Sequence, residues 1–75
     1  MDKRSLSIAG HRTSIALEPQ FWTALEAMAA QSGQTLAGLI RSIDETRQTD
    51  NLSSAVRLAV LDWYQRQLDD IRTAE

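Results

Sequence analysis

The sequence predicts a small, mostly α-helical domain with a single β-strand near its N-terminus. One segment, residues 11–17, alternates apolar and polar residues with the period of two that is typical of a strand. Three later segments repeat apolar residues at the three- and four-residue spacings of amphipathic helices. The chain has 75 residues, of which 43% are apolar, and no cysteine. These numbers fit one domain without disulfides, and a chain of this size gains from a partner that completes its core.

The predicted strand follows Gly10 and has two different faces. One face carries Thr13, Ile15 and Leu17, and the other carries Arg12, Ser14 and Ala16. We place the first face inward, because the opposite phase would expose two large apolar side chains to solvent.

The strand is the only segment of this kind that the pattern shows, so its backbone groups need a partner. We expect that partner to be the same strand of a second chain, forming an intermolecular two-stranded antiparallel ribbon. Residues 1–9 show no strong periodicity and are expected to form a flexible basic arm, so that the domain proper occupies residues 10–75.

The first helix is predicted from Pro19 to about Ser32, because proline suits the first helical position and Gly33 suits a left-handed helix end. Thr35 is the predicted N-cap of a short second helix, which ends in the polar stretch of residues 44–50.

A third, longer helix is predicted to begin after Asn51 or Ser53 and to reach roughly Asp70. Apolar residues cover most of its circumference in the middle turns, so we expect this helix to be buried against its own copy in a homodimer. The predicted dimer core comprises Ile15, Leu17, Phe21, Leu25, Val56, Val60 and Trp63.

Charge is distributed unevenly along the chain. The net charge is −2, yet residues 1–17 contain three basic residues and one acid. A local basic field attracts a polyanion even on an acidic protein. Catalysis finds little support, because the chain has one histidine, no cysteine and no glycine-rich phosphate loop. We expect no enzyme activity, no cofactor and no metal, and a cytoplasmic protein with no membrane segment.

The order of the motifs resembles the ribbon-helix-helix family of bacterial DNA-binding proteins. The segment TSIALEPQFW, residues 13–22, is similar to the strand-to-helix junction of the family. Two segments, GQTLAGLI at residues 33–40 and NLSSAVR at residues 51–57, both resemble the start of the family's second helix. The basic pattern has two helices and this chain has three, so either segment can be that start.

The resemblance implies a dimeric transcriptional regulator that inserts its ribbon into the major groove of a pseudo-palindromic operator. Under this hypothesis the base contacts come from Arg12, Ser14 and Ala16. The family anchors phosphates at the N-terminus of its second helix, which implies backbone contacts from Asn51, Ser53 and Ser54, with Thr35 as the runner-up. Lys3 and Arg4, on the flexible arm, are expected to contact the DNA backbone without regard to its sequence.

The alternative is a dimeric protein-interaction module, of an adaptor or antitoxin-like kind, with weak or no DNA binding. The acidic body and the additional helix favour it. Arg12 then serves as a solubilising charge on an exposed strand, and the polar residues at the helix starts act only as caps.

Overall fold

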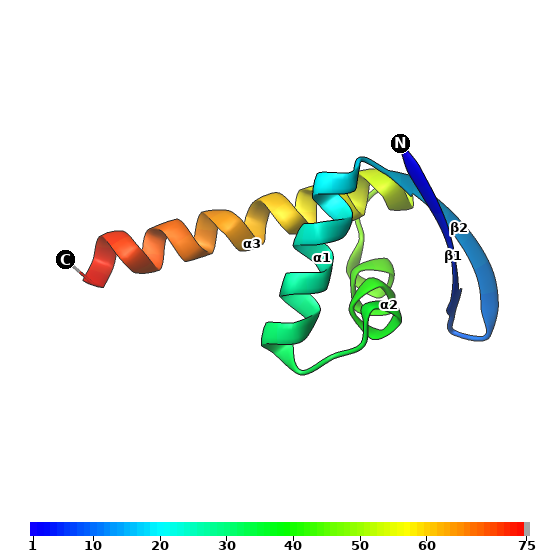
Figure 1. Ribbon diagram of the computed structural model, residues 1–75, viewed down its shortest axis with the longest axis horizontal. Helices are drawn as coiled ribbons and strands as arrows, with labels where there is room; N and C mark the ends of the chain where they lie inside the picture. The colour runs from blue at the N-terminus through cyan, green and yellow to red at the C-terminus, as the bar shows by residue number, and fades with distance from the viewer. Residues whose placement is uncertain (75) are drawn as a thin grey trace.

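The computed structural model describes residues 1–74 and consists of a β-hairpin followed by three helices (Figure 1). The elements, in chain order, are β1 (Asp2–Ile8), β2 (His11–Leu17), α1 (Pro19–Ser32), α2 (Leu36–Thr46) and α3 (Leu52–Ala74). The predicted class, mostly helical with strand structure at the N-terminus, is therefore confirmed.

The N-terminal segment differs from the prediction, because residues 2–8 form a strand and not a flexible arm. β1 pairs antiparallel with β2 over its whole length, from Asp2 opposite Leu17 to Ile8 opposite His11. The expectation that β2 lacks a partner within its own chain is therefore wrong. The argument that this strand must find a second chain to satisfy its backbone no longer applies.

A two-residue turn, Ala9-Gly10, connects the two strands. Both residues have positive φ, 53° for Ala9 and 82° for Gly10. This geometry matches the right-handed twist of a hairpin, and glycine adopts it without steric cost. The turn fixes the register, so residues of equal parity lie on the same face of both strands.

Contacts of Trp22 and Glu26 in α1 with β1 explain why residues 2–8 form a strand. The Trp22 side chain is 1% exposed, and its Nε1 donates a hydrogen bond to the Asp2 carbonyl oxygen at 2.9 Å. The Arg4 guanidinium carbon lies 4.6 Å from the centre of the Trp22 ring, and Arg4 Nη1 contacts Glu26 Oε1 at 2.9 Å. These partners are about twenty residues away in sequence, so the local pattern of residues 1–9 does not reveal them.

The helix boundaries follow the predicted signals closely. Pro19 begins α1, and Gly33 ends it in the left-handed conformation with φ 67°. The Thr35 hydroxyl accepts a hydrogen bond from the Gly38 backbone N–H at 3.0 Å and so caps α2. Asn51 caps α3, because its Oδ1 accepts from the Ser54 N–H at 3.2 Å.

The core lies where the inner face of the hairpin meets the three helices. Its fully buried members come from β2 and from each of the three helices: Ile15, Leu17, Trp22, Leu25, Ile40 and Val56. A single chain therefore buries a continuous apolar core.

Helix α3 extends well beyond this core (Figure 1). The Cα atoms span 44 Å along the longest axis, against 24 and 23 Å across it. The hairpin lies at one end of the long axis and the C-terminal end of α3 lies at the other. Among the described residues, no helix combines the length and the apolar character that crossing a bilayer requires.

Candidate nucleic-acid interface

The outward face of the hairpin, on the side away from the helices, carries only short polar side chains, an alanine and two cations. Three residues of β1 and three of β2 alternate with the inward positions and share this face: Lys3, Ser5, Ser7, Arg12, Ser14 and Ala16. We call this set the hairpin face. The predicted phase of β2 is confirmed, because Ile15 and Leu17 are buried on the inner side while Arg12 and Ser14 are exposed.

Cross-strand pairing orders the hairpin face into three rows. Lys3 lies opposite Ala16, Ser5 opposite Ser14, and Ser7 opposite Arg12. The two central hydroxyl oxygens are 3.1 Å apart and share a hydrogen bond. The cations occupy opposite strands and opposite ends of the face, about 13 Å apart along the strands at 3.3 Å per residue.

The hairpin face has no acidic residue. The acid of the hairpin, Asp2, belongs to the inward-facing set together with Arg4. Lysine and arginine at the ends and hydroxyls in the centre can bind phosphate oxygens and donate to or accept from base edges. Such a surface suits an anionic, hydrogen-bonding partner better than an apolar one.

Arg4, which the sequence suggested as a phosphate contact, lies on the other side of the hairpin. It is engaged by Glu26 and by the ring of Trp22, and its side chain is 41% exposed. The structure therefore separates it from Lys3, although the two residues are adjacent in sequence.

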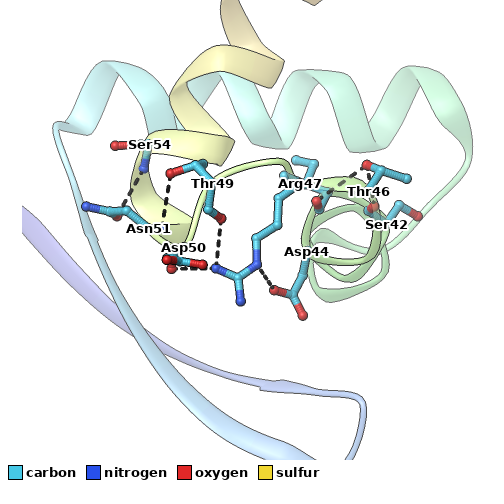
Figure 2. A network of polar contacts seen from close by, with 9 residues as sticks. Ser42, Asp44, Thr46, Arg47, Thr49, Asp50, Asn51 and Ser54 are labelled. Atoms are coloured by element: carbon cyan, nitrogen blue, oxygen red, sulfur yellow. Dashed lines mark hydrogen bonds and ion pairs between the residues drawn. The ribbon is translucent and has the colours of Figure 1, made fainter.

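The start of α3 is held by a polar network around the α2–α3 connection (Figure 2). The Arg47 guanidinium donates to the carbonyl oxygens of Thr49 and Asp50, at 3.2 and 2.5 Å, and contacts Asp44 Oδ1 at 2.9 Å. Arg47 thus joins the end of α2 to the residues that precede α3.

The expected phosphate contacts Asn51, Ser53 and Ser54 lie together at this helix start. The Asn51 side-chain Oδ1 already accepts a hydrogen bond from the Ser54 backbone N–H. This bond occupies one of the backbone N–H groups that a helix start offers to an anion.

Thr35 lies at a different place, at the end of the α1–α2 connection. One full length of α1, about 21 Å at 1.5 Å per residue, separates it from the β2–α1 junction. The structure thus brings together only part of the predicted interface: Lys3, Arg12, Ser14 and Ala16 share one face, and the remaining candidates lie elsewhere.

Sequence reasoning missed the β1 half of the hairpin face, in particular Ser5 and Ser7. The signal was present, because Leu6 and Ile8 alternate with these serines and an Ala9-Gly10 turn follows. Arg4 at an inward position interrupted the apolar pattern.

An ion pair positions α3 against the junction of β2 and α1. Glu18 Oε1 accepts hydrogen bonds from Arg57 Nε at 3.1 Å and Arg57 Nη2 at 3.0 Å. The pKa of the Glu18 carboxyl lies below its usual value, first because a backbone N–H donates to the carboxylate and second because Arg57 does. The guanidinium of Arg57 also lies 5.7 Å from the centre of the Phe21 ring.

The predicted dimer-core residues occupy the core of the single chain. Ile15, Leu17, Leu25, Val56 and Val60 are at most 5% exposed, and Phe21 and Trp63 pack against them in partly buried positions. Within residues 1–74 no cluster of three or more histidine or acidic side chains is arranged to hold a metal ion.

The structure is a two-stranded antiparallel ribbon with a basic, hydroxyl-rich outward face, followed by three packed helices. Comparison with known proteins agrees with this arrangement: the family described as the ribbon-helix-helix domain matches residues 1–64. The chain belongs to the ribbon-helix-helix family, and the resemblance seen in the sequence is confirmed. The match covers β1 and ends at Tyr64, inside α3. No curated protein and no solved structure matches the chain significantly.

Proposed function

We propose that this protein is a DNA-binding transcriptional regulator whose hairpin face enters the major groove. The observation that carries the proposal is the composition of this face: two cations, three serines, one alanine and no acid on a two-stranded ribbon. Membership of the ribbon-helix-helix family supports it.

The dimensions of the hairpin fit this role. The major groove of B-DNA is about 12 Å wide and admits a two-stranded β-ribbon, whose strands lie about 4.8 Å apart. Arg12 can bond guanine through O6 and N7, Ser14 can donate or accept, and Ala16 can contact a thymine methyl group. Lys3 at the opposite end contacts phosphate. Two protomers, each with one hairpin, read the two halves of a pseudo-palindromic operator.

The test begins with selection of bound sequences from a random duplex pool, followed by anisotropy titrations with the selected and an unrelated duplex. Arg12→Ala should weaken binding to the selected duplex about 5- to 150-fold, as expected when one bidentate interaction with a base is removed, and should change unrelated binding less. Lys3→Ala should weaken both duplexes alike and lower the salt slope of binding by about 0.9 for each phosphate that the lysine no longer neutralises.

Arg41→Ala is the matched control. It removes one exposed positive charge from α2, where Arg41 pairs with Glu45 within the helix. The Arg41→Ala variant should bind DNA with the same affinity as the unmodified protein. If Arg12→Ala and Lys3→Ala bind the selected duplex as tightly as this control does, the hairpin face is not the reader and the proposal fails.

A second candidate function is binding of another protein, which the exposed apolar side chains of α3 favour. In that case the duplex pool yields no enriched sequence. In a pull-down, the unmodified chain binds one stoichiometric protein partner, and variants with substitutions in α3 do not bind it.

A further inference from the structure

A groove of about 330 Å³ lies between the inner side of the hairpin and the α2–α3 connection, residues 47–51. It is on the far side of the hairpin from the hairpin face, because His11 and Thr13 alternate with Arg12 and Ser14 along β2. Ligand sites in proteins have volumes of about 300–1,000 Å³, so this groove has room for one small molecule. The lining residues that matter for binding are Ile8, His11, Thr13, Arg47, Asp50 and Leu52.

The Arg47 guanidinium presents one unused nitrogen to this groove (Figure 2). Its Nε contacts Asp44 Oδ1 at 2.9 Å, and its Nη1 donates to the carbonyl oxygens of Thr49 and Asp50. Nη2 has no hydrogen-bond partner within residues 1–74, and it points toward the side on which the hairpin lies. Because the other two nitrogens are fixed by their contacts, Nη2 is a donor held in one direction. Carboxylates are among the acceptors that a guanidinium binds most strongly.

Asp50 supplies the opposite charge in the same groove. Its carbonyl oxygen accepts a hydrogen bond from Arg47 Nη1, so the two residues are direct neighbours. Its carboxylate has neither an ion pair nor a hydrogen bond with any residue of the described chain, 1–74. The Thr13 hydroxyl and the His11 imidazole, which β2 contributes, also have no partner in this part of the chain. The groove thus collects four polar side chains with hydrogen-bonding groups that a ligand can use.

The charges of the groove favour a ligand that carries both signs. One guanidinium and two carboxylates, those of Asp44 and Asp50, line it, which gives a net charge of −1 with a neutral histidine. This net charge disfavours a simple anion. A simple cation would pair with Asp50 and leave Arg47 Nη2 without an acceptor. A zwitterion satisfies the donor and the carboxylate together.

We propose that this groove binds a free α-amino acid with an aliphatic side chain. The ligand carboxylate accepts hydrogen bonds from Arg47 Nη2 and the Thr13 hydroxyl, and the ligand ammonium donates to the Asp50 carboxylate. An α-amino acid carries its two charged groups on one carbon, which matches the direct contact between Arg47 and Asp50. Its aliphatic side chain packs against Ile8 and Leu52, the large apolar residues of the groove.

A ligand in this position connects two parts of the fold. Ile8 and Thr13 belong to the hairpin, and Arg47 and Asp50 belong to the α2–α3 connection. The bound amino acid therefore fastens the turn end of the hairpin to the helices, while the hairpin face on the other side stays free. The inference adds ligand binding to the proposed function and does not rest on DNA binding.

The first test is an NMR titration of the ¹⁵N-labelled protein with L-leucine, up to roughly 20 mM. The dissociation constant should be about 1 mM or lower, because two charge-assisted interactions and one packed side chain act together. The amide signals of residues 8–13 and 47–52 should shift, and those of the distal half of α3 should not.

Leucine analogues test which groups of the ligand are recognised. N-acetyl-L-leucine has no ammonium group, and L-leucinamide has no carboxylate. Each should bind at least about 10-fold more weakly than leucine, because each loses one charge-assisted interaction. Glycine keeps both charged groups but has no aliphatic side chain, so it should also bind about 10-fold more weakly.

Two variants test which groups of the protein are used. Asp50→Asn should weaken leucine binding at least about 10-fold, and Thr13→Val about 3- to 10-fold, since the latter loses one neutral hydrogen bond. Asp70→Asn is the matched control, because it makes the same exchange at an exposed carboxylate of α3 outside the groove. This control should bind leucine like the unmodified protein. Circular dichroism of each variant verifies that the fold is intact.

Three outcomes would each overturn the proposal. They are the absence of saturable shifts up to roughly 20 mM leucine, binding of N-acetyl-L-leucine or L-leucinamide as tight as that of leucine, and leucine binding by Asp50→Asn that equals binding by Asp70→Asn. None of these measurements involves DNA, so failure of this proposal and failure of the proposed function are separate results.

Discussion

Replacing Trp22 by phenylalanine tests whether α1 holds β1 in place. The substitution removes the Nε1 hydrogen bond to the Asp2 carbonyl, which contributes about 1 kcal/mol. It also leaves a cavity of about 40 Å³ at a side chain that is 1% exposed, which costs about 1 kcal/mol. The smaller ring weakens the interaction with Arg4 by a few tenths of a kcal/mol.

We therefore expect Trp22→Phe to lower the free energy of unfolding by about 2 kcal/mol. A chain of 75 residues has roughly 4–11 kcal/mol of stability, so the variant should remain folded. Urea unfolding monitored by circular dichroism measures the loss. Amide hydrogen exchange measures where the loss falls, and β1 should exchange faster than α1, because the missing hydrogen bond connects these two elements.

Trp63→Phe is the matched control. Trp63 packs on the core from α3 and makes an edge-to-face contact with Tyr64, with ring centres 4.8 Å apart. This variant should lose stability without faster exchange in β1. If Trp22→Phe leaves β1 exchange no faster than Trp63→Phe does, then Trp22 does not anchor the strand and the account of the ordered N-terminus is wrong.

Three further substitutions test the turn and the Glu18–Arg57 pair. Ala9→Asn should stabilise the protein by about 0.5–1 kcal/mol, because asparagine tolerates the positive φ at this position better than alanine. Gly10→Ala should destabilise the protein by about 1–2 kcal/mol. The cause is backbone strain alone, since a Cβ added at Gly10 would have no atom within 4 Å. Equal melting temperatures for the Ala9→Asn and Gly10→Ala variants would contradict this account. Glu18→Gln should be less stable than the unmodified protein at neutral pH. Because the folded-state pKa of Glu18 is lowered, its stabilisation is complete above its usual pKa and disappears as the pH falls through the lowered value. Urea unfolding at a series of pH values should therefore show the two proteins converging in acid, and a constant difference would exclude the ion pair as its cause.

The helices were predictable because their ends depend on local chemistry. Pro19, Gly33 and Thr35 act within a few residues of themselves, so the sequence alone locates the ends of α1 and the start of α2. Helix α3 extends four residues beyond the predicted end near Asp70, because residues 71–74 contain no glycine or proline that would stop the helix.

β1 was not predictable by the same reasoning, because its stabilising contacts are not local. Arg4 takes an inward position that an apolar pattern assigns to a hydrophobic residue, and Trp22 and Glu26 make that position favourable. Half of the hairpin face depends on this strand. The inward and outward faces of β2 were predictable, since burial of Ile15 and Leu17 fixes the phase of the strand.

Because one chain forms its whole apolar core by itself, its folding does not require association with a second chain. Ile15, Leu25 and Val56 are sealed by residues of their own chain, and the hairpin completes its pairing between neighbours in sequence. In the dimer of the proposed function, subunits can therefore exchange without unfolding. Under the proposed function, occupancy of an operator then follows the cellular concentration of the protein steeply, since each bound pair assembles from free protomers.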